Sequence, residues 1–472
     1  MTVNTQLAII GGGPGGYAAA FLAADLGMQV TLIDLEKNPG GVCLYRGCIP
    51  SKALLHIAKL IKEAEEAKKW GVEFGELKID LDRLRDFKNG VVNKLTGGLG
   101  QLSKQRKVNF IQGKASFINS NTLSVKKVDG TTDEVHYEKA ILATGSVPSK
   151  VPGLSIESPR VMDSTSALEL NDIPKRLLVI GGGYIGLELS TVYAALGSKV
   201  TVVEMLSGLL PGADRDLVAV LDKRVRSMME NVFTETKVVE LKETAEGITV
   251  RLEGDKVTEP EQTFDKVLIS VGRKPVTTGL GLENTKVKIN ELGFVTVDKT
   301  LKTEDPSIFA IGDIVGNPML AHKAAAEGKV AVEAILGHKV AFEPNAIPAV
   351  VFTDPELAWT GLTETEARQK EIKVEVAKFP WGASGRATTL DRNDGMTKLI
   401  VEPGTERILG VGIVGVGAGD MIAEGTLAIE MGAVVKDLEL TIHPHPTLSE
   451  TMMAAAEVFY GHATDMYRPK RK

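Results

Sequence analysis

The chain has 472 residues, of which 43% are hydrophobic and 25% are charged, and its formal net charge at pH 7 is −6. This length suggests about three domains, and the acidic balance argues against a nucleic-acid-binding protein, because no excess of Lys and Arg is available to neutralise phosphates. No leader peptide and no apolar run of about 18 residues is recognised, so we expect a cytoplasmic protein that does not enter a membrane.

A glycine-rich turn follows the first predicted strand, at residues 7–10. Gly11, Gly13 and Gly16 in this turn precede an alanine-rich helix, and a second strand then ends at Asp34. Such a turn lets a pyrophosphate approach the backbone at the positive end of a helix dipole, and an acid about 20 residues further on can accept hydrogen bonds from a ribose. The segment therefore predicts a βαβ unit that binds a dinucleotide.

The two cysteines of the chain follow closely, at Cys43 and Cys48. Because the chain is long and carries no other thiol, the pair is unlike the framework of a disulfide-stapled secreted domain, and we predict an exchangeable redox pair. In a straight helix their Cα atoms would lie about 7.5 Å apart, whereas bridged cysteines lie about 4.4–6.8 Å apart. A bridge thus requires a distorted turn, which Gly47 permits. The alternatives are two free core thiols or half of a zinc site, for which a second Cys pair is missing.

Charged helices and then a hairpin are predicted between residues 70 and 138, with Asp129-Gly130 as a type I′ turn signal. A strand-like run over residues 141–145 follows, and at its end we expect the chain to come close to the cofactor for a second time.

The first βαβ unit is then repeated. The second copy has the same order of strand, glycine-rich turn, helix and strand, and its glycines and acid are Gly181, Gly183, Gly186 and Glu204. No Arg or Lys stands directly after the acid to pair a 2′-phosphate, so this site is predicted to prefer NAD over NADP. Two dinucleotide sites in one chain indicate two cofactors that meet at their redox ends, one of them a bound flavin.

Later motifs are shorter. Gly312-Asp313 follows a strand-like run, and the Asp313 carboxylate is expected either to cap the next helix or to reach the ribityl chain of a cofactor. Beyond Pro344 there is no nucleotide motif, and the strand patterning there predicts an α+β domain.

The C-terminal motif is centred on His445. Prolines on both sides of it exclude a helix, so we predict a rigid loop before a helix that Ser449 caps. Glu450 can accept a hydrogen bond from one ring nitrogen and so raise the basicity of the other, which suits a general base for a thiol. The alternatives are a surface role, or metal binding together with His443; we predict no metal site.

Taken in this order, the motifs resemble those of the pyridine nucleotide–disulfide oxidoreductases, and most of all those of members that oxidise dihydrolipoamide. The resemblance covers essentially the whole chain. It implies an α/β fold with two dinucleotide-binding (Rossmann-like) βαβ domains, the NAD domain inserted in the FAD domain, and a C-terminal α+β dimerisation domain. The implied boundaries are 1–148 for the first part of the FAD-binding domain, 149–272 for the NAD-binding domain, 273–344 for the FAD/central second part and 345–472 for the dimerisation domain.

The resemblance also implies roles for individual residues. The catalytic residues would be Cys43, Cys48, His445 and Glu450, with His445 acting from the partner subunit of a homodimer. Those at FAD would be Gly11, Gly13, Gly16, Asp34, Lys52, Thr144, Gly145 and Asp313, with Lys52 paired to Glu188. Those at NAD would be Gly181, Gly183, Gly186, Glu204 and Gly272.

Three positions depart from the family's pattern. Asp34 stands where relatives more often have Glu, which predicts a longer contact to the cofactor. Tyr45 and Arg46 replace an Asn-Val pair between the cysteines, so the surface beside the bridge, and with it the approach of the substrate, is expected to differ.

The implied reaction is oxidation of protein-bound dihydrolipoamide to lipoamide, with NAD⁺ reduced to NADH. The implied partner is a lipoyl domain, either of a 2-oxoacid dehydrogenase acyltransferase or of the glycine-cleavage H protein. The alternative is a related flavoprotein disulfide reductase. Mercuric and thioredoxin reductases would need a further C-terminal Cys pair, glutathione reductase uses NADPH, and a soluble transhydrogenase would lack the first cysteine. A non-catalytic protein would have no reason to keep all these motifs.

Overall fold

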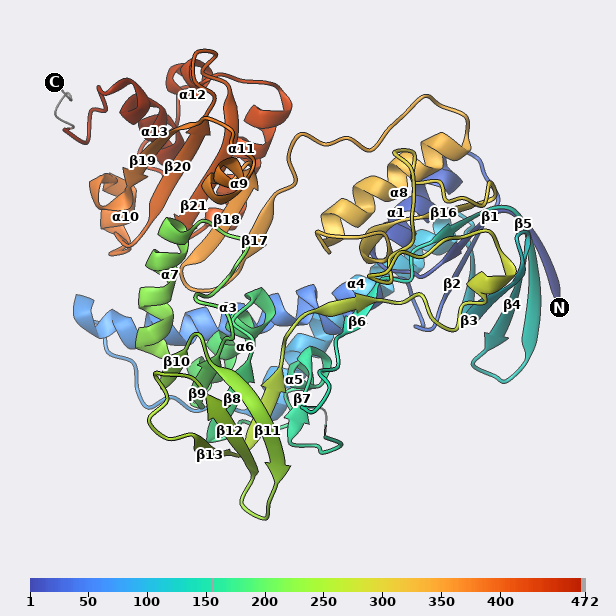
Figure 1. The fold of residues 1–472 in the computed structure, drawn as a ribbon, viewed down its shortest axis with the longest axis horizontal. Helices are drawn as coiled ribbons and strands as arrows, with labels where there is room; N and C mark the ends of the chain where they lie inside the picture. Colours follow the sequence, from blue (N-terminus) through green and yellow to red (C-terminus); the bar gives the residue numbers. More distant parts are fainter. Residues whose placement is uncertain (155, 468–472) are drawn as a thin grey trace.

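The computed structural model describes residues 1–154 and 156–467, whose strands gather in three regions of the molecule (Figure 1). The first region contains the N-terminus and a segment that returns to it later in the chain. The second is built from the middle of the sequence, and the third from the C-terminal part. Within the described residues, no helix is both long and apolar enough to cross a membrane.

The sheet of the first region is organised around one buried central strand. This strand, β1, pairs in parallel with β2 and β5; β2 pairs in parallel with β3, and β5 with β16, while β4 joins the outer ends of β3 and β5 in an antiparallel hairpin arrangement. The bounds are β1 (Thr2–Ile10), β2 (Val30–Asp34), β3 (Asn109–Asn119), β4 (Thr122–Lys127), β5 (Thr132–Leu142) and β16 (Ile308–Ala310). Because β16 comes long after β5, the chain between them forms an insertion, as the resemblance implied.

The inserted second region has an all-parallel sheet in the order β10-β9-β8-β14-β7 and an antiparallel sheet in the order β11-β12-β13. The two strands through which the chain enters and leaves the insertion, β6 and β15, pair with each other in an antiparallel manner. The bounds are β6 (Ser146–Pro148), β7 (Val161–Met162), β8 (Arg176–Ile180), β9 (Lys199–Val203), β10 (Asn231–Phe233), β11 (Lys237–Glu243), β12 (Ile248–Glu253), β13 (Glu261–Phe264), β14 (Lys266–Ile269) and β15 (Arg273–Pro275).

The third region has an antiparallel sheet in the order β17-β18-β21-β20-β19 with helices packed against it, so the predicted C-terminal α+β domain is confirmed. Its strands are β17 (Ala349–Val351), β18 (Glu356–Gly361), β19 (Glu375–Pro380), β20 (Met396–Val401) and β21 (Ile408–Gly415). Its helices are α9 (Glu364–Gln369), α10 (Gly385–Thr389), α11 (Ala418–Glu430), α12 (Val435–Leu440) and α13 (Glu450–Tyr460).

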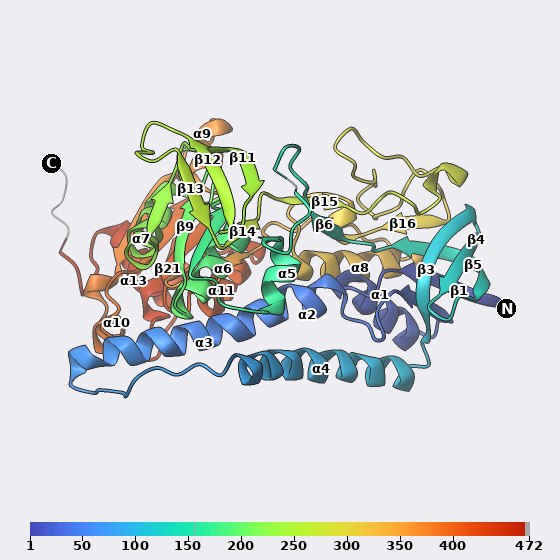
Figure 2. The same cartoon turned by 90° about the horizontal axis from the view of Figure 1, so that it is seen from below.

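Helices connect the regions. Helix α3 begins in the first region, packs on α6 of the second and lies alongside α4 (Figure 2), while α8 packs closely on α1. The remaining helices are α1 (Pro14–Asp25), α2 (Gly41–Arg46), α3 (Cys48–Glu66), α4 (Leu81–Gln105), α5 (Ser164–Glu169), α6 (Tyr184–Ala195), α7 (Arg215–Met228) and α8 (Ala321–Ile335). Short 3₁₀ turns are η1 (Ala67–Trp70), η2 (Leu282–Asn284), η3 (Gly312–Ile314) and η4 (Trp381–Ala383).

The predicted hairpin is confirmed between β4 and β5, but the type I′ turn is wrong. A type I′ turn needs positive φ at both central residues, whereas of Asp129 and Gly130 only the glycine has a positive φ, of 85°. The amide of Gly130 instead donates to Lys127 O, and the Asp129 carboxylate accepts from the Thr131 amide. The aspartate is thus satisfied locally, and a longer turn results.

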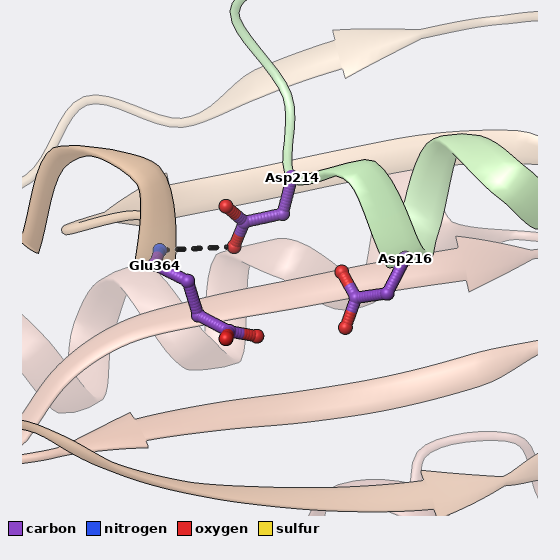
Figure 3. A group of neighbouring side chains, drawn as sticks. All are labelled: Asp214, Asp216 and Glu364. Carbon is purple, nitrogen blue, oxygen red and sulfur yellow. Dashed lines mark hydrogen bonds between the residues drawn. The ribbon is translucent and has the colours of Figure 1, made fainter. Parts of the chain in front are cut away.

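A buried lysine joins the second and third regions. Lys398 on β20 has a side chain that is 0% exposed, and its Nζ donates to Asp214 at 2.6 Å, Asp216 at 2.8 Å and Glu364 at 3.0 Å. The backbone amide of Glu364 also donates to Asp214, as Figure 3 shows. Three carboxylates of this kind are able to hold a cation, but here the ammonium group lies among them, and the cluster is an ion-pair network between α7, α9 and β20.

Removing this ammonium is expected to destabilise the protein strongly. Lys398→Met should lower the free energy of unfolding by about 3–5 kcal/mol, because the buried Asp214 carboxylate would lose the only ammonium group that pairs with it among the described residues. Lys378→Met is the matched control: its ammonium pairs with the same Asp216 and Glu364 but is 40% exposed, so the loss should stay below about 1 kcal/mol. Thermal unfolding measures both, and equal midpoints for the two variants would contradict the role assigned to Lys398.

The same network sets a pH dependence. Burial alone would raise the pKa values of Asp214 and Asp216, but the lysine ammonium groups hold both below the usual range. This contribution to stability is therefore present above the ordinary aspartate pKa of about 3.9 and is lost as the pH falls through the lower folded-state values. The difference in unfolding midpoint between wild type and Lys398→Met should accordingly shrink in acid.

Candidate active site

A cavity of about 550 Å³ lies where the first and second regions meet. It runs from the first glycine-rich turn to the break between α2 and α3, and its walls include residues of α6 and the segment around η3. Of the predicted site residues, the cavity is lined by Gly11, Gly13, Asp34, Cys43, Cys48, Lys52, Thr144, Gly145, Glu188 and Asp313.

The first glycine-rich turn is held by its own acid. The Asp34 carboxylate accepts from the amide of Gly12 and, at 2.8 Å, from that of Glu36. Burial raises its pKa, although the hydrogen bond from Gly12 opposes the shift. Gly16 sits so close to the strand that a Cβ there would lie 1.8 Å from Gly11 O. Helix α1 therefore begins tightly against β1, with no side-chain cap on its N-terminus.

The second turn repeats this arrangement. Glu204 accepts from the amides of Gly182 at 2.7 Å and Leu206 at 2.8 Å, and a Cβ at Gly186 would lie 2.2 Å from Gly181 O. The N-terminus of α6 likewise has no side-chain cap. The remaining predicted residues of this set, Gly181, Gly183, Gly186, Glu204 and Gly272, do not line the 550 Å³ cavity.

These turns fit dinucleotides. An uncapped helix N-terminus offers free amide donors and a positive dipole end to a pyrophosphate. Each carboxylate oxygen that already accepts one amide keeps a further lone pair for a ribose hydroxyl. At the first turn, the N-terminus of α2 also approaches closely, since a Cβ at Gly41 would lie 2.5 Å from the Cα of Gly13. Two helix starts thus face one cavity.

The redox cysteines lie on either side of a break in the helix. Helix α2 ends at Arg46, Gly47 adopts φ −144° and ψ −113°, and α3 begins at Cys48. A Cβ at Gly47 would lie 2.9 Å from Val42 O, so the close turn depends on glycine. The predicted distortion at Gly47 is confirmed. Both cysteines are free thiols in this structure, and the pKa of each depends most on a hydrogen bond to the other.

This contact separates the acidities of the two sulfurs. The hydrogen bond from Cys43, aided by the charge of Lys52, lowers the pKa of Cys48 to about 7, although burial opposes the shift. The same hydrogen bond, together with burial, raises the pKa of Cys43 far above its usual range. As the pH rises through about 7 the reduced pair therefore comes to carry one thiolate, on Cys48.

An ion pair between the partly exposed Lys52 and the buried Glu188 lies beside the cysteines. Lys52 Nζ lies 2.8 Å from Glu188 Oε2, and Glu188, 3% exposed, also accepts from the Phe352 amide at 3.0 Å. The Lys52 ammonium lies 4.6 Å from the centroid of the Phe352 ring. The expected pair is thus brought together at a point where α3, α6 and the segment after β17 meet.

The segment around Asp313 closes another side of the cavity. Asp313 lies in η3, and helix α8 begins only at Ala321, with Leu320 as its N-cap, so the capping role considered for Asp313 is wrong. Its carboxylate accepts from Ser146 Oγ at 2.5 Å, and Arg273 donates to the same hydroxyl at 2.8 Å.

Several residues of this wall were missed in the sequence. Ser146 and Arg273 follow the predicted Gly145 and Gly272 directly, but only the pairing of β6 with β15 brings them together. Glu327 on α8 accepts from the Gly312 amide at 2.6 Å and pairs with Lys323 at 2.6 Å, both side chains being buried. The sequence feature that could have indicated this ion pair is the spacing of Lys323 and Glu327, which stand one helical turn apart in an alanine-rich segment.

The C-terminal loop pairs its histidine as expected. His445 Nδ1 lies 2.9 Å from Glu450 Oε1, and Glu450 also accepts from the Thr447 amide at 2.7 Å. Ser449 precedes α13 but makes no side-chain cap, because its hydroxyl bonds Thr447; the predicted cap is wrong.

His445 does not meet the cysteines within one chain. Its side chain is 78% exposed in the third region and does not line the cavity. The cysteines belong to α2 and to the start of α3, and α13, which follows the histidine loop, lies apart from α2 in Figure 2. His443 is engaged separately, by Glu424 at 2.8 Å and Thr441 O at 2.8 Å.

Comparisons with known proteins point to one family along almost the whole chain. Residues 5–328 match the family model of pyridine nucleotide-disulphide oxidoreductases, and residues 347–456 match the dimerisation domain of that family. The chain is 48% identical over 470 residues to the dihydrolipoyl dehydrogenases of Vibrio cholerae and Haemophilus influenzae, covering 100% of this chain and 98% of each relative.

Solved structures of flavoprotein disulfide reductases and related proteins share the fold of this chain. LpdA from Mycobacterium tuberculosis superposes with a TM-score of 0.89 at 27% identity, covering 96% of this chain and 99% of that one. The HOCl-induced flavoprotein disulfide reductase RclA from Escherichia coli superposes with a TM-score of 0.84 at 30% identity, covering 96% and 99%.

Ionisation of Cys48 in the reduced protein can be followed by a pH titration. As the pH of the reduced protein rises through about 7, the ultraviolet absorbance of thiolate should increase by one thiolate per chain, because Cys48 then loses its proton. Cys43→Ala should move this midpoint upward by removing the hydrogen bond, Lys52→Met should move it upward by removing a positive charge, and Cys48→Ser should abolish the step. A wild-type midpoint near the ordinary value of about 8.5 would contradict this interpretation.

Proposed function

The chain belongs to the pyridine nucleotide-disulphide oxidoreductase family, and we propose that it oxidises dihydrolipoamide to lipoamide while reducing NAD⁺ to NADH. It is an NAD-dependent flavoprotein oxidoreductase with FAD and NAD as cofactors. The observation that carries the proposal is the thiol pair held across Gly47 beside Lys52 and Glu188, in a chain 48% identical to curated dihydrolipoyl dehydrogenases over its full length.

The division into functional domains is part of this proposal. We assign residues 1–148 and 273–344 to the FAD-binding and central part, 149–272 to the NAD-binding domain and 345–472 to the dimerisation domain. The pairing of β6 with β15 supports the two boundaries of the insertion, because the chain crosses between the first and second regions there.

The large cavity is the proposed FAD site. Gly11, Gly13, Gly16 and Asp34 would hold the adenosine and pyrophosphate, and Lys52, Thr144, Gly145 and Asp313 would hold the rest. The chemistry that bound FAD supplies is two-electron transfer between the thiol pair and NAD⁺. The chain's part is to orient the cofactor with the uncapped helix N-termini and to keep the Lys52–Glu188 pair beside its reactive end.

Gly181, Gly183, Gly186, Glu204 and Gly272 would form the NAD site. A preference for NAD over NADP is supported by the surroundings of Glu204. The Arg that reaches this loop, Arg215, donates to the backbone carbonyls of Leu209, Leu210 and Ala213. Because its guanidinium already donates to these carbonyls, Arg215 is not positioned to bind a 2′-phosphate.

In the oxidised enzyme the cysteines are proposed to form a disulfide. His445 of the partner subunit, oriented by Glu450, would take the proton of one substrate thiol, and the resulting thiolate would attack Cys43 Sγ. The Cys43–Cys48 bond then breaks and Cys48 leaves as a thiolate. The second substrate sulfur attacks the first and breaks its bond to Cys43, which closes lipoamide, and the proton of that second thiol passes to Cys43, which is returned as a thiol. The pKa of about 7 suits Cys48 to this role, because a more acidic thiol is a better leaving group.

The third region carries the family's dimerisation domain, which indicates a homodimer. An exposed His445 is consistent with completion of the active site by a second copy. The proposed partner is a lipoyl domain, of a 2-oxoacid dehydrogenase acyltransferase or of the glycine-cleavage H protein. Location in the cytoplasm stays a prediction from the sequence.

One assay tests the proposed substrates. Steady-state turnover of dihydrolipoamide with NAD⁺ should exceed turnover of reduced glutathione or reduced thioredoxin, and NAD⁺ should be preferred to NADP⁺. Equal turnover of glutathione or thioredoxin would contradict the proposal and would favour assignment to one of the related disulfide reductases. A preference for NADP⁺ would favour the same assignment.

Replacement of His445 tests the proposed base. His445→Gln should slow flavin reduction by dihydrolipoamide by roughly 10²–10⁴-fold, because general base catalysis contributes about this much. Flavin reduction by NADH should keep its rate, since that reaction needs no thiol proton. His338→Gln, at an exposed histidine 4.0 Å from Glu333, is the control and should behave as wild type in stopped-flow measurements. Unchanged reduction by dihydrolipoamide in His445→Gln would refute the assignment.

A further inference from the structure

The two unusual residues between the cysteines both reach back to the segment after β2. Tyr45 Oη donates to Asn38 O at 3.1 Å and accepts from the Asn38 amide at 3.2 Å. The Arg46 guanidinium forms an ion pair with Glu36 and also lies over the Tyr45 ring, 6.0 Å from its centroid. Helix α2 is thereby fastened to residues 36–38 by side chains that the Asn-Val pattern of relatives would not provide.

Arg46 lies on the face of α2 that lines the large cavity. Val42, one turn earlier on the same face, lines it too, as residues four apart on a helix do. Glu36 lines the cavity from the opposite side of the ion pair, and its amide is bound by the Asp34 carboxylate. The guanidinium therefore stands at the end of the cavity where the ribose acid and the first glycine-rich turn lie.

The charges at this end suit a phosphorylated ligand. The carboxylates of Asp34 and Glu36 face two cations, Arg46 and Lys114 of β3, all four lining the cavity. The charge of Arg46 also acts directly on Asp34, whose carboxyl pKa it helps to hold down against the effect of burial. A planar guanidinium with one side engaged by a carboxylate keeps further N–H donors free for phosphate or ribose oxygens.

We propose that Arg46 is a cofactor-binding residue whose guanidinium, oriented by Glu36, contacts the adenosine diphosphate half of FAD and fastens α2 over it. This inference rests on the proposed function, because it takes FAD as the ligand of the cavity. It explains why an arginine stands in the redox segment without contacting either sulfur: it acts on retention of the cofactor and not on thiol exchange.

Binding of FAD and of ADP to the FAD-free protein tests the inference. Arg46→Val should weaken FAD binding about tenfold, the size of a charge-assisted hydrogen bond, and should weaken ADP by a similar factor, because the contact is to the half that both share. Arg46→Lys keeps the charge but not the planar donor fork, so its loss should be intermediate. Raising the salt concentration should weaken the wild type more than Arg46→Val.

The matched control is Arg106→Val. Arg106 pairs with Asp25 and lies over the ring of Phe21, outside the cavity lining, so its loss should leave both affinities unchanged. Calorimetry measures the affinities, and circular dichroism checks the folding of each variant. Should Arg46→Val misfold, Arg46→Lys and Glu36→Gln carry the test, each with a smaller expected loss.

Wild-type affinity for FAD and ADP in the folded Arg46 variants would overturn the inference, and so would a loss confined to FAD, since the contact would then lie outside the ADP half. A wild-type protein that bound no FAD would instead overturn the proposed function on which the inference rests.

Discussion

The contact between Cys43 and Cys48 is the interaction on which the rest of the site depends. A continuous helix would hold these sulfurs apart, and the break at Gly47 lets a hydrogen bond between them govern the pKa of each. One thiol then stabilises the other as a thiolate, and the Lys52 ammonium adds to this effect. The redox chemistry proposed here follows from that asymmetry, because the sulfur that is the better leaving group is fixed before any substrate arrives.

Around this contact, the three regions are joined by buried charges. Glu188 binds Lys52 of α3 and the backbone after β17, so it connects all three at the site. Lys398 performs a similar function further away, where it joins the start of α7 to the C-terminal sheet. Unpaired, these groups would cost several kcal/mol each, so the regions are held in one relative arrangement. That arrangement leaves His445 exposed, in a position suited to act on a second copy.

Local motifs were predictable from the sequence, and non-local contacts were not. Each glycine-rich turn with its acid is specified by neighbouring residues, so Gly16 against Gly11 and Gly186 against Gly181 follow from the pattern. The hairpin at Asp129-Gly130 was also found, although its turn type depends on which φ angles the strands impose. Ser449 and Asp313 were judged by position in the sequence, whereas their actual partners, Thr447 and Ser146, are set by the folded loop and by β6. The Lys398 network joins three distant segments, and no periodic pattern marks it.

Electrons from the dithiol substrate are proposed to reach the flavin only through the two sulfurs. The most direct measurement is a single-turnover reduction of the FAD-loaded Cys48→Ser protein by dihydrolipoamide, with reduction by NADH as the internal reference. In this variant dihydrolipoamide should leave the flavin oxidised while NADH still reduces it. Reduction by dihydrolipoamide at the wild-type rate would show that electrons can bypass the two sulfurs.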